Sequence, residues 1–210
     1  MDEADRNLDA RLSTLKREHE TLQGEAKALR NFIDALKALT DALESPQRET
    51  DVLKLLETIL EKAIDAIDAE DGSLLVPDDT TKELVFAMVR GESHNEALFG
   101  RRVPAGKGVV SWVFEHRRAA IVNNASADER FYREVDNEID YKTNSLLAAP
   151  LIGGGRVLGV IEVINKREGK LFSIGNQTLL SVICRFAGEL LFTMVKDIDL
   201  TRTMNIPKLG

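Results

Sequence analysis

The sequence predicts an α+β fold: a coiled-coil helix, then an antiparallel sheet with long N- and C-terminal helices on one face. Three observations lead to this fold class. Leucines recur every seven residues near the N-terminus, short apolar runs fill the middle of the chain, and long amphipathic segments flank those runs. The 210 residues suffice for one ordinary domain and an extension. We therefore expect a dimerisation helix over 1–45, a domain over 46–198 and a C-terminal tail over 199–210.

The N-terminal segment has the heptad pattern of a coiled coil. A repeat sustained over more than five heptads is a specific sign of helix association. His19 and Thr40 lie on the seam, where polar side chains weaken association but restrict register; we interpret His19 in this way rather than as a pH switch. The flanking charges do not decide between parallel and antiparallel pairing. The d positions are Leu8, Leu15, Leu22, Leu29, Leu36 and Leu43, and the a positions are Leu12, His19, Ala26, Ile33 and Thr40.

A first domain helix is predicted after Ser45-Pro46, which interrupts the heptads. Serine suits a helix cap, and proline suits the first turn that follows it. From Val52 to Ile67 the apolar residues are spaced by three and four, which is typical of an amphipathic helix with a wide buried face.

Short apolar runs after Asp71-Gly72 predict the strands of an antiparallel sheet, separated by turn residues. The run Gly153-Gly154-Gly155 joins the last two strands as a hairpin, since it lacks the lysine and following helix of a phosphate-binding loop. The predicted strands are Ser73–Val76, Leu84–Val89, Ala120–Val122, Leu146–Ile152 and Val157–Ile164.

A short helix is predicted over Val109–Glu115, after the glycine-rich segment Pro104–Gly108. This segment lacks the spacing of a nucleotide-binding loop, and Lys107 is followed by glycine instead of a hydroxyl residue. Two interpretations remain open: the free amides at the helix start hold an anion, or the segment is only a flexible helix start.

A long C-terminal amphipathic helix is predicted before Pro207, on the same sheet face as the helix 52–67. Its apolar positions are Ile174, Leu179, Ile183, Phe186, Leu190 and Met194.

Composition narrows the function. A net charge of −7 without a basic run argues against nucleic-acid binding, and we find no apolar stretch near the ~18–20 residues of a membrane helix. Cys184, the single cysteine, is expected to be a small buried hydrophobic side chain. The three histidines show no metal-ligand spacing. We expect a cytoplasmic protein that is not an enzyme and binds no metal.

Several motifs lie between Asn123 and Phe192. They are Asn124-Ala125, Asp128–Phe131, Glu134–Asp136, Tyr141–Thr143, Ala149–Leu151 and Leu158–Lys166. Together they resemble the GAF domains of cyclic-nucleotide phosphodiesterases and related adenylyl cyclases, with weaker similarity back to about Asp71. The resemblance implies the GAF fold for the predicted sheet and its helices.

The family's signature is asparagine-lysine, a spacer, phenylalanine, three residues and aspartate-glutamate. Asn165, Lys166 and Phe172 match it, whereas Asn176 and Gln177 replace the acidic pair. In the family the lysine pairs with the aspartate to brace the domain. The resemblance therefore implies that Lys166 and Asn176 form at most a charge-assisted hydrogen bond.

The resemblance also implies a ligand pocket. Arg90 is expected either to pair with a phosphate or to lie on the surface. Val89-Arg90 replaces an aromatic-acid pair, and Ile139 replaces a threonine that would read a base edge. The implied pocket residues are Ser73, Asp136 and Thr143 facing a base, Val109 and Val110 near a cyclic phosphate, and Glu162.

Two functions follow from this resemblance. In the first, the domain is a sensor that binds cAMP, cGMP or another compact metabolite and transmits occupancy through the coiled coil. In the second, it is a ligand-independent dimerisation and interaction scaffold. We expect a homodimer through the coil and flanking helices, with a separate output protein as a partner, and neither nucleic acid nor membrane.

Overall fold

The computed structural model describes residues 49–91 and 96–194, together with residues 11–16, 19, 23, 24, 26, 30, 33, 34 and 37. The predicted tail over 199–210 lies outside these residues, as does the Ser45-Pro46 boundary.

A six-stranded antiparallel sheet forms the centre of the domain, in the strand order β3-β2-β1-β6-β5-β4. Each predicted strand is present, which confirms the α+β class. A two-residue strand, β3, was missed by the sequence analysis because it is too short to show an alternation. The strands are β1 (Ala69–Pro77), β2 (Leu84–Gly91), β3 (Arg102–Val103), β4 (Ala120–Val122), β5 (Leu146–Gly153) and β6 (Arg156–Lys166).

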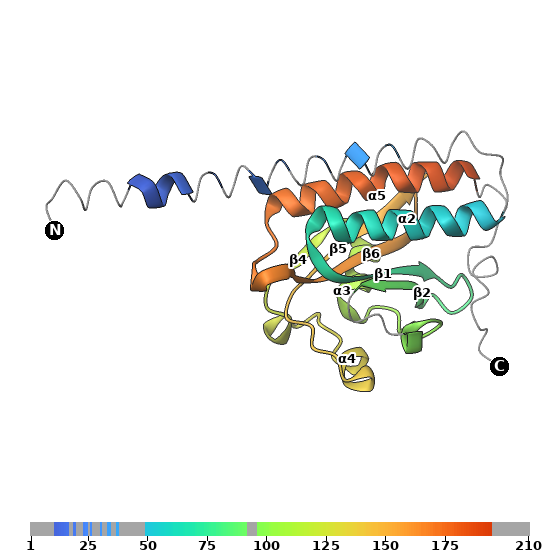
Figure 1. Ribbon diagram of the computed structural model, residues 1–210. Coiled ribbons are helices and arrows are strands. Elements are labelled where there is room, and N and C mark those ends of the chain that lie inside the picture. The colour runs from blue at the N-terminus through green and yellow to red at the C-terminus, as the bar shows by residue number, and fades with distance from the viewer. Residues whose placement is uncertain are drawn as a thin grey trace, which may run out of the picture.

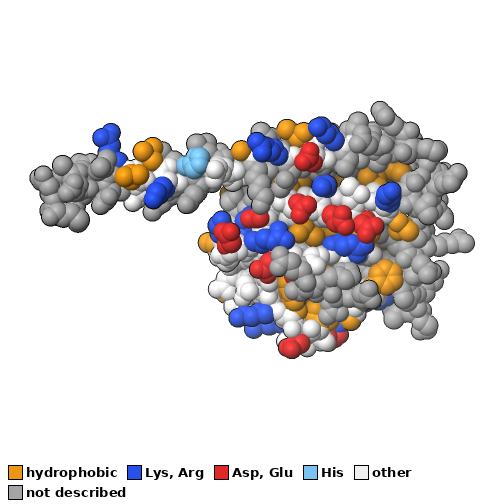
Figure 2. Space-filling model, in the orientation of Figure 1, with side chains coloured by type: hydrophobic (Ala, Val, Ile, Leu, Met, Phe, Trp, Pro, Cys, Tyr) orange, Lys and Arg blue, Asp and Glu red, His pale blue; other side chains and the backbone are white. Residues whose placement is uncertain are grey.

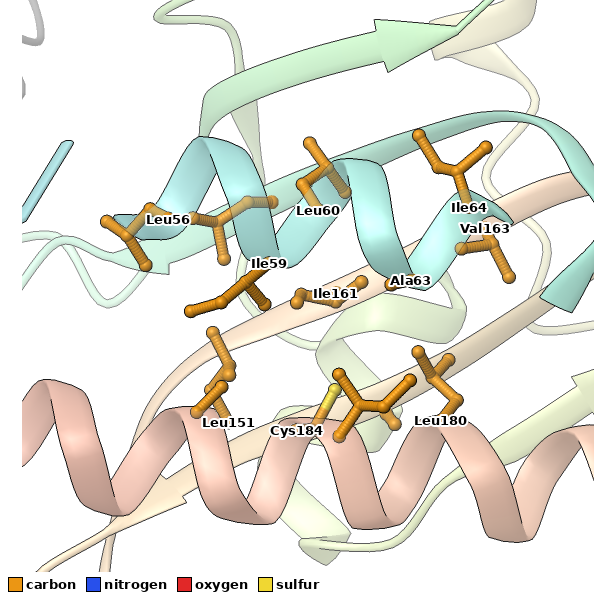
Figure 3. Packing of buried hydrophobic residues seen from close by; sticks show 14 of the residues in the cluster. Leu56, Ile59, Leu60, Ala63, Ile64, Leu151, Ile161, Val163, Leu180 and Cys184 are labelled. Carbon is orange, nitrogen blue, oxygen red and sulfur yellow. The ribbon is translucent and has the colours of Figure 1, made fainter. Parts of the chain in front are cut away.

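Two long helices, α2 (Glu49–Ile67) and α5 (Ile174–Met194), cover one face of the sheet, as predicted (Figure 1). Figure 3 shows Ile59 and Ala63 of α2 next to Ile161 of β6, with α5 beside them. Cys184 of α5 is fully buried in this cluster. Burial in an apolar environment raises the pKa of its thiol, so it is the inert core side chain that the sequence predicted.

The opposite face carries α3 (Gly108–His116) and the short helix α4 (Glu134–Ile139), with a second apolar cluster beneath them (Figure 1). Helix α3 follows the glycine-rich segment, where Gly106 and Gly108 both have left-handed φ values, 73° and 79°. That conformation suits glycine because it has no Cβ. The interior of the domain thus has two layers of apolar packing, one on each face of the sheet.

The hairpin between β5 and β6 is closed by Gly154 and Gly155, both with positive φ, which confirms the predicted hairpin connection. Next to it, α5 approaches the sheet closely at Gly188. A Cβ added at Gly188 would lie 2.4 Å from the carbonyl oxygen of Ile152. This glycine lets the helix backbone lie directly on β5.

The apolar residues of α5 are not all buried. Ile174 and Phe186, which the sequence analysis assigned to the apolar stripe, are 71% and 56% exposed. By length and composition α5 passes as a membrane-spanning helix, so the expectation that no apolar stretch comes near that length is wrong. Within the domain, its buried residues pack against the sheet and α2.

The described residues between 11 and 37 are helical, and the stretch 11–16 extends beyond the sheet (Figure 1). Leu12, Leu15 and Ile33, which belong to the heptad seam, are exposed in the single chain. Figure 2 shows acidic and basic side chains interspersed on this face of the molecule. Pairing of the coil stays a prediction, and the d-position leucines other than Leu15 lie outside the described residues.

Candidate functional site

A cavity lies between the sheet and the helices α3 and α4. Its volume is about 80 Å³, and most of its lining is apolar. Every pocket residue expected from the resemblance lines it except Arg90. The polar lining residues are Asp71, Ser73, Tyr132, Asp136, Tyr141, Thr143 and Glu162.

The sheet register places Ser73 of β1 opposite Glu162 of β6, and both side chains line the cavity. The Ser73 hydroxyl donates a hydrogen bond of 2.7 Å to Glu162 Oε1. Glu162 is only 8% exposed. Its pKa is raised to about 7, mainly by burial; the Ser73 hydrogen bond lowers the pKa, and the negative charge of Asp136 adds to the rise. Near neutral pH this carboxyl group can therefore accept or donate a hydrogen bond.

Helix α4 and the loop after it close the cavity and are fixed by Asp136. Its two carboxylate oxygens accept hydrogen bonds from the Thr143 amide and hydroxyl, each of 2.8 Å. The helix ends at Asp140, whose left-handed φ of 51° turns the chain back toward the sheet. Asp136 and Thr143 were both expected to line the ligand pocket, and in the structure they also contact each other.

A second tie joins this cap, the segment from α4 to residue 145, to the sheet. The Tyr141 hydroxyl donates to Asp71 Oδ2 of β1 at 2.6 Å, and Asp71 is buried. Burial and the hydrogen bond to Asp71 both raise the pKa of the Tyr141 hydroxyl, so it remains a protonated donor. The sequence analysis did not assign a role to either residue. The available signal was an acidic residue beside Gly72, just before the apolar run of β1.

The start of α3 forms the opposite wall, where Val109 and Val110 line the cavity. No side chain caps this helix at its N-cap residue, Lys107. Amides in the first turn of an α-helix have no acceptor four residues earlier in the same helix. This end of the cavity therefore offers backbone donors and the positive end of a helix dipole.

Asn165, the first signature residue, holds the cap from the end of β6. It is buried and has a left-handed φ of 54°. Its Oδ1 accepts from the Asn144 amide at 2.8 Å, and its Nδ2 donates to the Lys142 carbonyl at 3.0 Å and the Tyr141 hydroxyl at 3.1 Å. The side chain thus holds residues 141–144, the loop that follows α4, against the end of β6.

The other signature residues act away from the cavity. The Lys166 ammonium donates to the carbonyl of Ile67, the last residue of α2, and lies 3.9 Å from a carboxylate oxygen of Asp68. Phe172 is buried, and its amide donates to Asn123 Oδ1 at 2.8 Å.

Asn176 differs from the expected brace. Its Oδ1 accepts from the Ser173 amide and hydroxyl, and its own amide donates to Ser173 Oγ. This reciprocal arrangement is a capping box at the start of α5. The replacement of the acidic residue thus corresponds to a local helix cap, whereas Lys166 secures the C-terminal end of α2.

Arg90 does not lie at the cavity, so its assignment to the ligand site is corrected. Val89 pairs with Ser73 and faces the cavity, and the next residue points to the other side of the sheet. There the Arg90 guanidinium forms an ion pair with Glu57 of α2. The Arg90 side chain is half-buried in this ion pair, so it matches neither the phosphate contact nor a fully exposed position.

Apolar side chains occupy much of the cavity wall. Phe131, Val135 and Ile139 from the cap region lie opposite Val89 and Leu146 of the sheet. Among the residues that the structure describes, no group of three or more His, Cys, Asp or Glu side chains is arranged to hold a metal ion. The arrangement is that of a binding site with directed polar groups at two ends.

Cyclic-nucleotide phosphodiesterases are among the proteins to which this chain is similar. A dual 3′,5′-cyclic-AMP and -GMP phosphodiesterase 11 of Drosophila melanogaster is 30% identical over 169 residues, covering 74% of this chain and 12% of the phosphodiesterase. The phosphodiesterase 11A of Takifugu rubripes, also dual for cyclic AMP and GMP, is 37% identical over 89 residues, covering 41% of this chain and 10% of that protein. The chain thus spans about a tenth of the length of these relatives.

Solved structures share the fold at low identity. The GAF domain of a phosphoenolpyruvate-protein phosphotransferase from Coxiella burnetii has a TM-score of 0.66 and 18% identity, over 81% of this chain and 96% of that one. Free methionine-R-sulfoxide reductase from Neisseria meningitidis, in complex with its substrate, has a TM-score of 0.65 and 16% identity, over 82% of this chain and 94% of that one. A family model described as GAF domain matches residues 49–191, and the chain therefore belongs to the GAF domain family.

Proposed function

We propose that this chain is a regulatory, non-catalytic sensor, which binds a small molecule in the cavity and transmits occupancy to α2, α5 and a dimeric coiled coil. One observation carries the proposal: the cavity brings together Ser73, Asp136, Thr143 and Glu162 at one end and the α3 start at the other. Such convergence of a few polar groups in an apolar hollow is typical of ligand sites.

A cyclic nucleotide, cAMP or cGMP, is the ligand that these two ends favour. Backbone amides at the α3 start suit an anionic phosphate, and the carboxyl groups of Asp136 and Glu162 suit the N–H donors of a purine. Relatives named for cyclic AMP and cyclic GMP support the same choice. The cavity volume of about 80 Å³ is below the roughly 300 Å³ at which small-molecule pockets begin. Binding therefore requires the cap to move outward.

Movement of the cap provides a route to α2. Asn165 holds the cap, and the next residue, Lys166, holds the carbonyl end of α2 at Ile67. A displacement of the loop that pulls on Asn165 acts on both contacts, because the two residues are consecutive. A ligand that binds the open-cap state more tightly than the closed-cap state would shift the equilibrium toward the open state, and toward the position of α2 that goes with it. The size of this shift is set by the difference in affinity between the two states.

The proposal extends to the assembly. We propose a cytoplasmic homodimer through the coil and the flanking helices, which acts on a separate output protein without contacting nucleic acid or membrane. The exposed seam residues Leu12, Leu15 and Ile33 support this pairing, since a partner helix would bury them. Light scattering tests it, and a monomeric mass at micromolar concentration would contradict the dimer.

Calorimetric titration of the full chain with cAMP and with cGMP tests the sensor. We expect heat and a raised melting temperature with at least one of them. Asp136→Asn should weaken that binding by about tenfold or more, because a carboxylate acceptor is lost. Asp140→Asn is the matched control, since it makes the same charge change at the exposed end of α4, where asparagine tolerates the left-handed φ. No heat and no thermal shift at millimolar concentration of either nucleotide would refute the cyclic-nucleotide proposal.

A second function, a ligand-independent dimerisation and interaction scaffold, is favoured by the apolar filling of the cavity. Phe131 and Ile139 both line it, and its volume is small. This function predicts that the isolated chain gives no thermal shift with a broad metabolite set, and that its partner binding is unaffected by any of them. A shift from one compound that disappears in Asp136→Asn and persists in Asp140→Asn would exclude it.

A further inference from the structure

A second hollow lies on the outer surface of the domain, between the turn that joins α3 to β4 and the exposed side of α5. Its volume is about 650 Å³, much larger than that of the cavity under the cap. It shares no lining residue with that cavity. The walls come from Arg117 and Arg118 on one side and Arg185 and Phe186 of α5 on the other, and Ile152 of β5 lines it as well.

Positive charge is concentrated in this groove. Its lining includes three arginines and neither aspartate nor glutamate, in a chain whose net charge is −7. Arg117 is fixed at the end of α3, where its guanidinium donates to the Gly155 carbonyl at 2.8 Å. Arg185 lies 4.0 Å from Glu189, and both side chains are largely exposed, so solvent screens this pair. Within the part of the chain that the structure describes, most guanidinium donors of the groove therefore remain available for a carboxylate partner.

An apolar surface accompanies the charges. Phe186 is more than half exposed, and Val182, one turn earlier on α5, lines the same groove with Ile152. Aromatic and arginine side chains are enriched at the centres of protein interfaces. Exposure of the arginines and of Phe186 also leaves the groove open to solvent, whereas small-molecule sites bury most of their ligand.

We propose that this groove binds an acidic peptide segment of a partner protein, with carboxylates against Arg117, Arg118 and Arg185 and an apolar side chain against Phe186. Charge complementarity selects this occupant. A carboxylate matches the planar fork of arginine in a bidentate geometry, and alternating acidic and apolar side chains match the arrangement of charged walls and apolar residues. Polyanions such as nucleic acids are disfavoured because three arginines do not compensate the repulsion from a net charge of −7.

Fluorescence anisotropy on the full chain tests this proposal with three labelled ten-residue peptides. The first alternates glutamate with leucine and phenylalanine, the second has lysine in place of each glutamate, and the third has serine in place of each apolar residue. We expect binding of the first, weakening with added salt, and at least tenfold weaker binding of the other two. No binding of the first peptide at millimolar protein would overturn the proposal.

Matched variants assign the binding to the groove. Charge reversal at Arg117, Arg118 and Arg185 to glutamate should weaken binding by at least tenfold. Charge reversal at three exposed lysines elsewhere, K54E/K82E/K107E, makes the same change in net charge and should have a much smaller effect. Equal losses in the two triple variants would overturn the proposal, since attraction would then depend only on net charge.

Milder variants separate binding from folding. R118Q/R185Q leaves Arg117 in place, and Phe186→Ser is paired with Ile174→Ser, which removes another exposed apolar side chain of α5. We expect R118Q/R185Q and Phe186→Ser to weaken binding by about fivefold or more while retaining the melting temperature, and Ile174→Ser to have no effect. If the triple arginine variant instead lowers the mass of the wild-type assembly in light scattering, a second copy occupies the groove and the proposal is wrong.

Discussion

Ionisation of Glu162 should make the stability of the domain depend on pH. The side chain is buried beside Ser73, and burial raises its pKa from the ordinary value of 4.5 to about 7. Between these two values the unfolded chain releases a proton that the folded chain keeps. The contribution of Glu162 to the unfolding free energy is therefore fully present below pH 4.5. It decreases as the pH rises toward 7 and is lost above that pH.

The magnitude follows from the same shift. One pKa unit corresponds to about 1.4 kcal/mol, so a rise from 4.5 to about 7 gives a loss on the order of 3 kcal/mol across that window. Glu162→Gln has no ionisable group and keeps an acceptor for the Ser73 hydroxyl. The difference in unfolding free energy between the wild type and this variant should therefore fall by about 3 kcal/mol between pH 4.5 and pH 7.5.

Urea denaturation followed by circular dichroism at intervals of one pH unit measures this difference. Glu129→Gln, at an exposed carboxyl of similar chemistry, is the control and should give a constant difference from the wild type. Asp136→Asn should shift the wild-type dependence to lower pH, because the charge of Asp136 contributes to the raised pKa. A Glu162→Gln difference that stays constant over the whole range would refute the reasoning from burial.

Three further predictions concern packing, the cap and the coil. Gly188→Ala should lower the unfolding free energy, measured by urea denaturation, by about 1–3 kcal/mol, because its Cβ would lie 2.4 Å from the β5 backbone. Gly175→Ala, on the same helix but without such a contact, is the control and should be neutral or stabilising. Asn165→Gly keeps the left-handed φ but loses the hydrogen bonds to the cap, so we expect a loss of about 2 kcal/mol and faster hydrogen exchange of the loop amides; unchanged exchange would contradict this role. Replacing Leu22 and Leu29 by lysine should halve the mass in light scattering and leave the far-ultraviolet signal of the sheet unchanged.

Periodicity made most of the fold predictable. Apolar spacing identified the helices α2 and α5, and alternation bounded by glycine and proline identified the strands of more than two residues. Periodicity did not predict which part of an apolar stripe meets the sheet. Ile174 lies at the very start of α5 and Phe186 on its outer side, so both remain exposed although they follow the helical spacing.

The candidate site was predictable in part, and Arg90 illustrates the difference. Family position assigned it to the pocket, but strand alternation already excluded it once Val89 was known to face inward. By contrast, the hydrogen bond between Asp71 and Tyr141 joins residues 70 positions apart, and no local pattern indicates such a contact. The capping box of Asn176 was visible as serine followed three residues later by an amide, yet the family comparison directed attention to Lys166 instead.

Under the proposed sensor function, the contacts around the cap link ligand binding to the stability of the domain. The cap is tied to the sheet through Tyr141–Asp71 and through Asn165, and both ties are buried or partly buried. A ligand larger than the cavity must loosen at least one of them, which costs free energy that its contacts with Asp136 and Glu162 have to offset. Because the Asn165 tie is continuous with the Lys166 contact to α2, loosening it is also the step that reaches the helices. Weakening that tie, as in Asn165→Gly, should therefore increase ligand affinity while reducing the response of α2, a combination that a purely structural role of Asn165 does not predict.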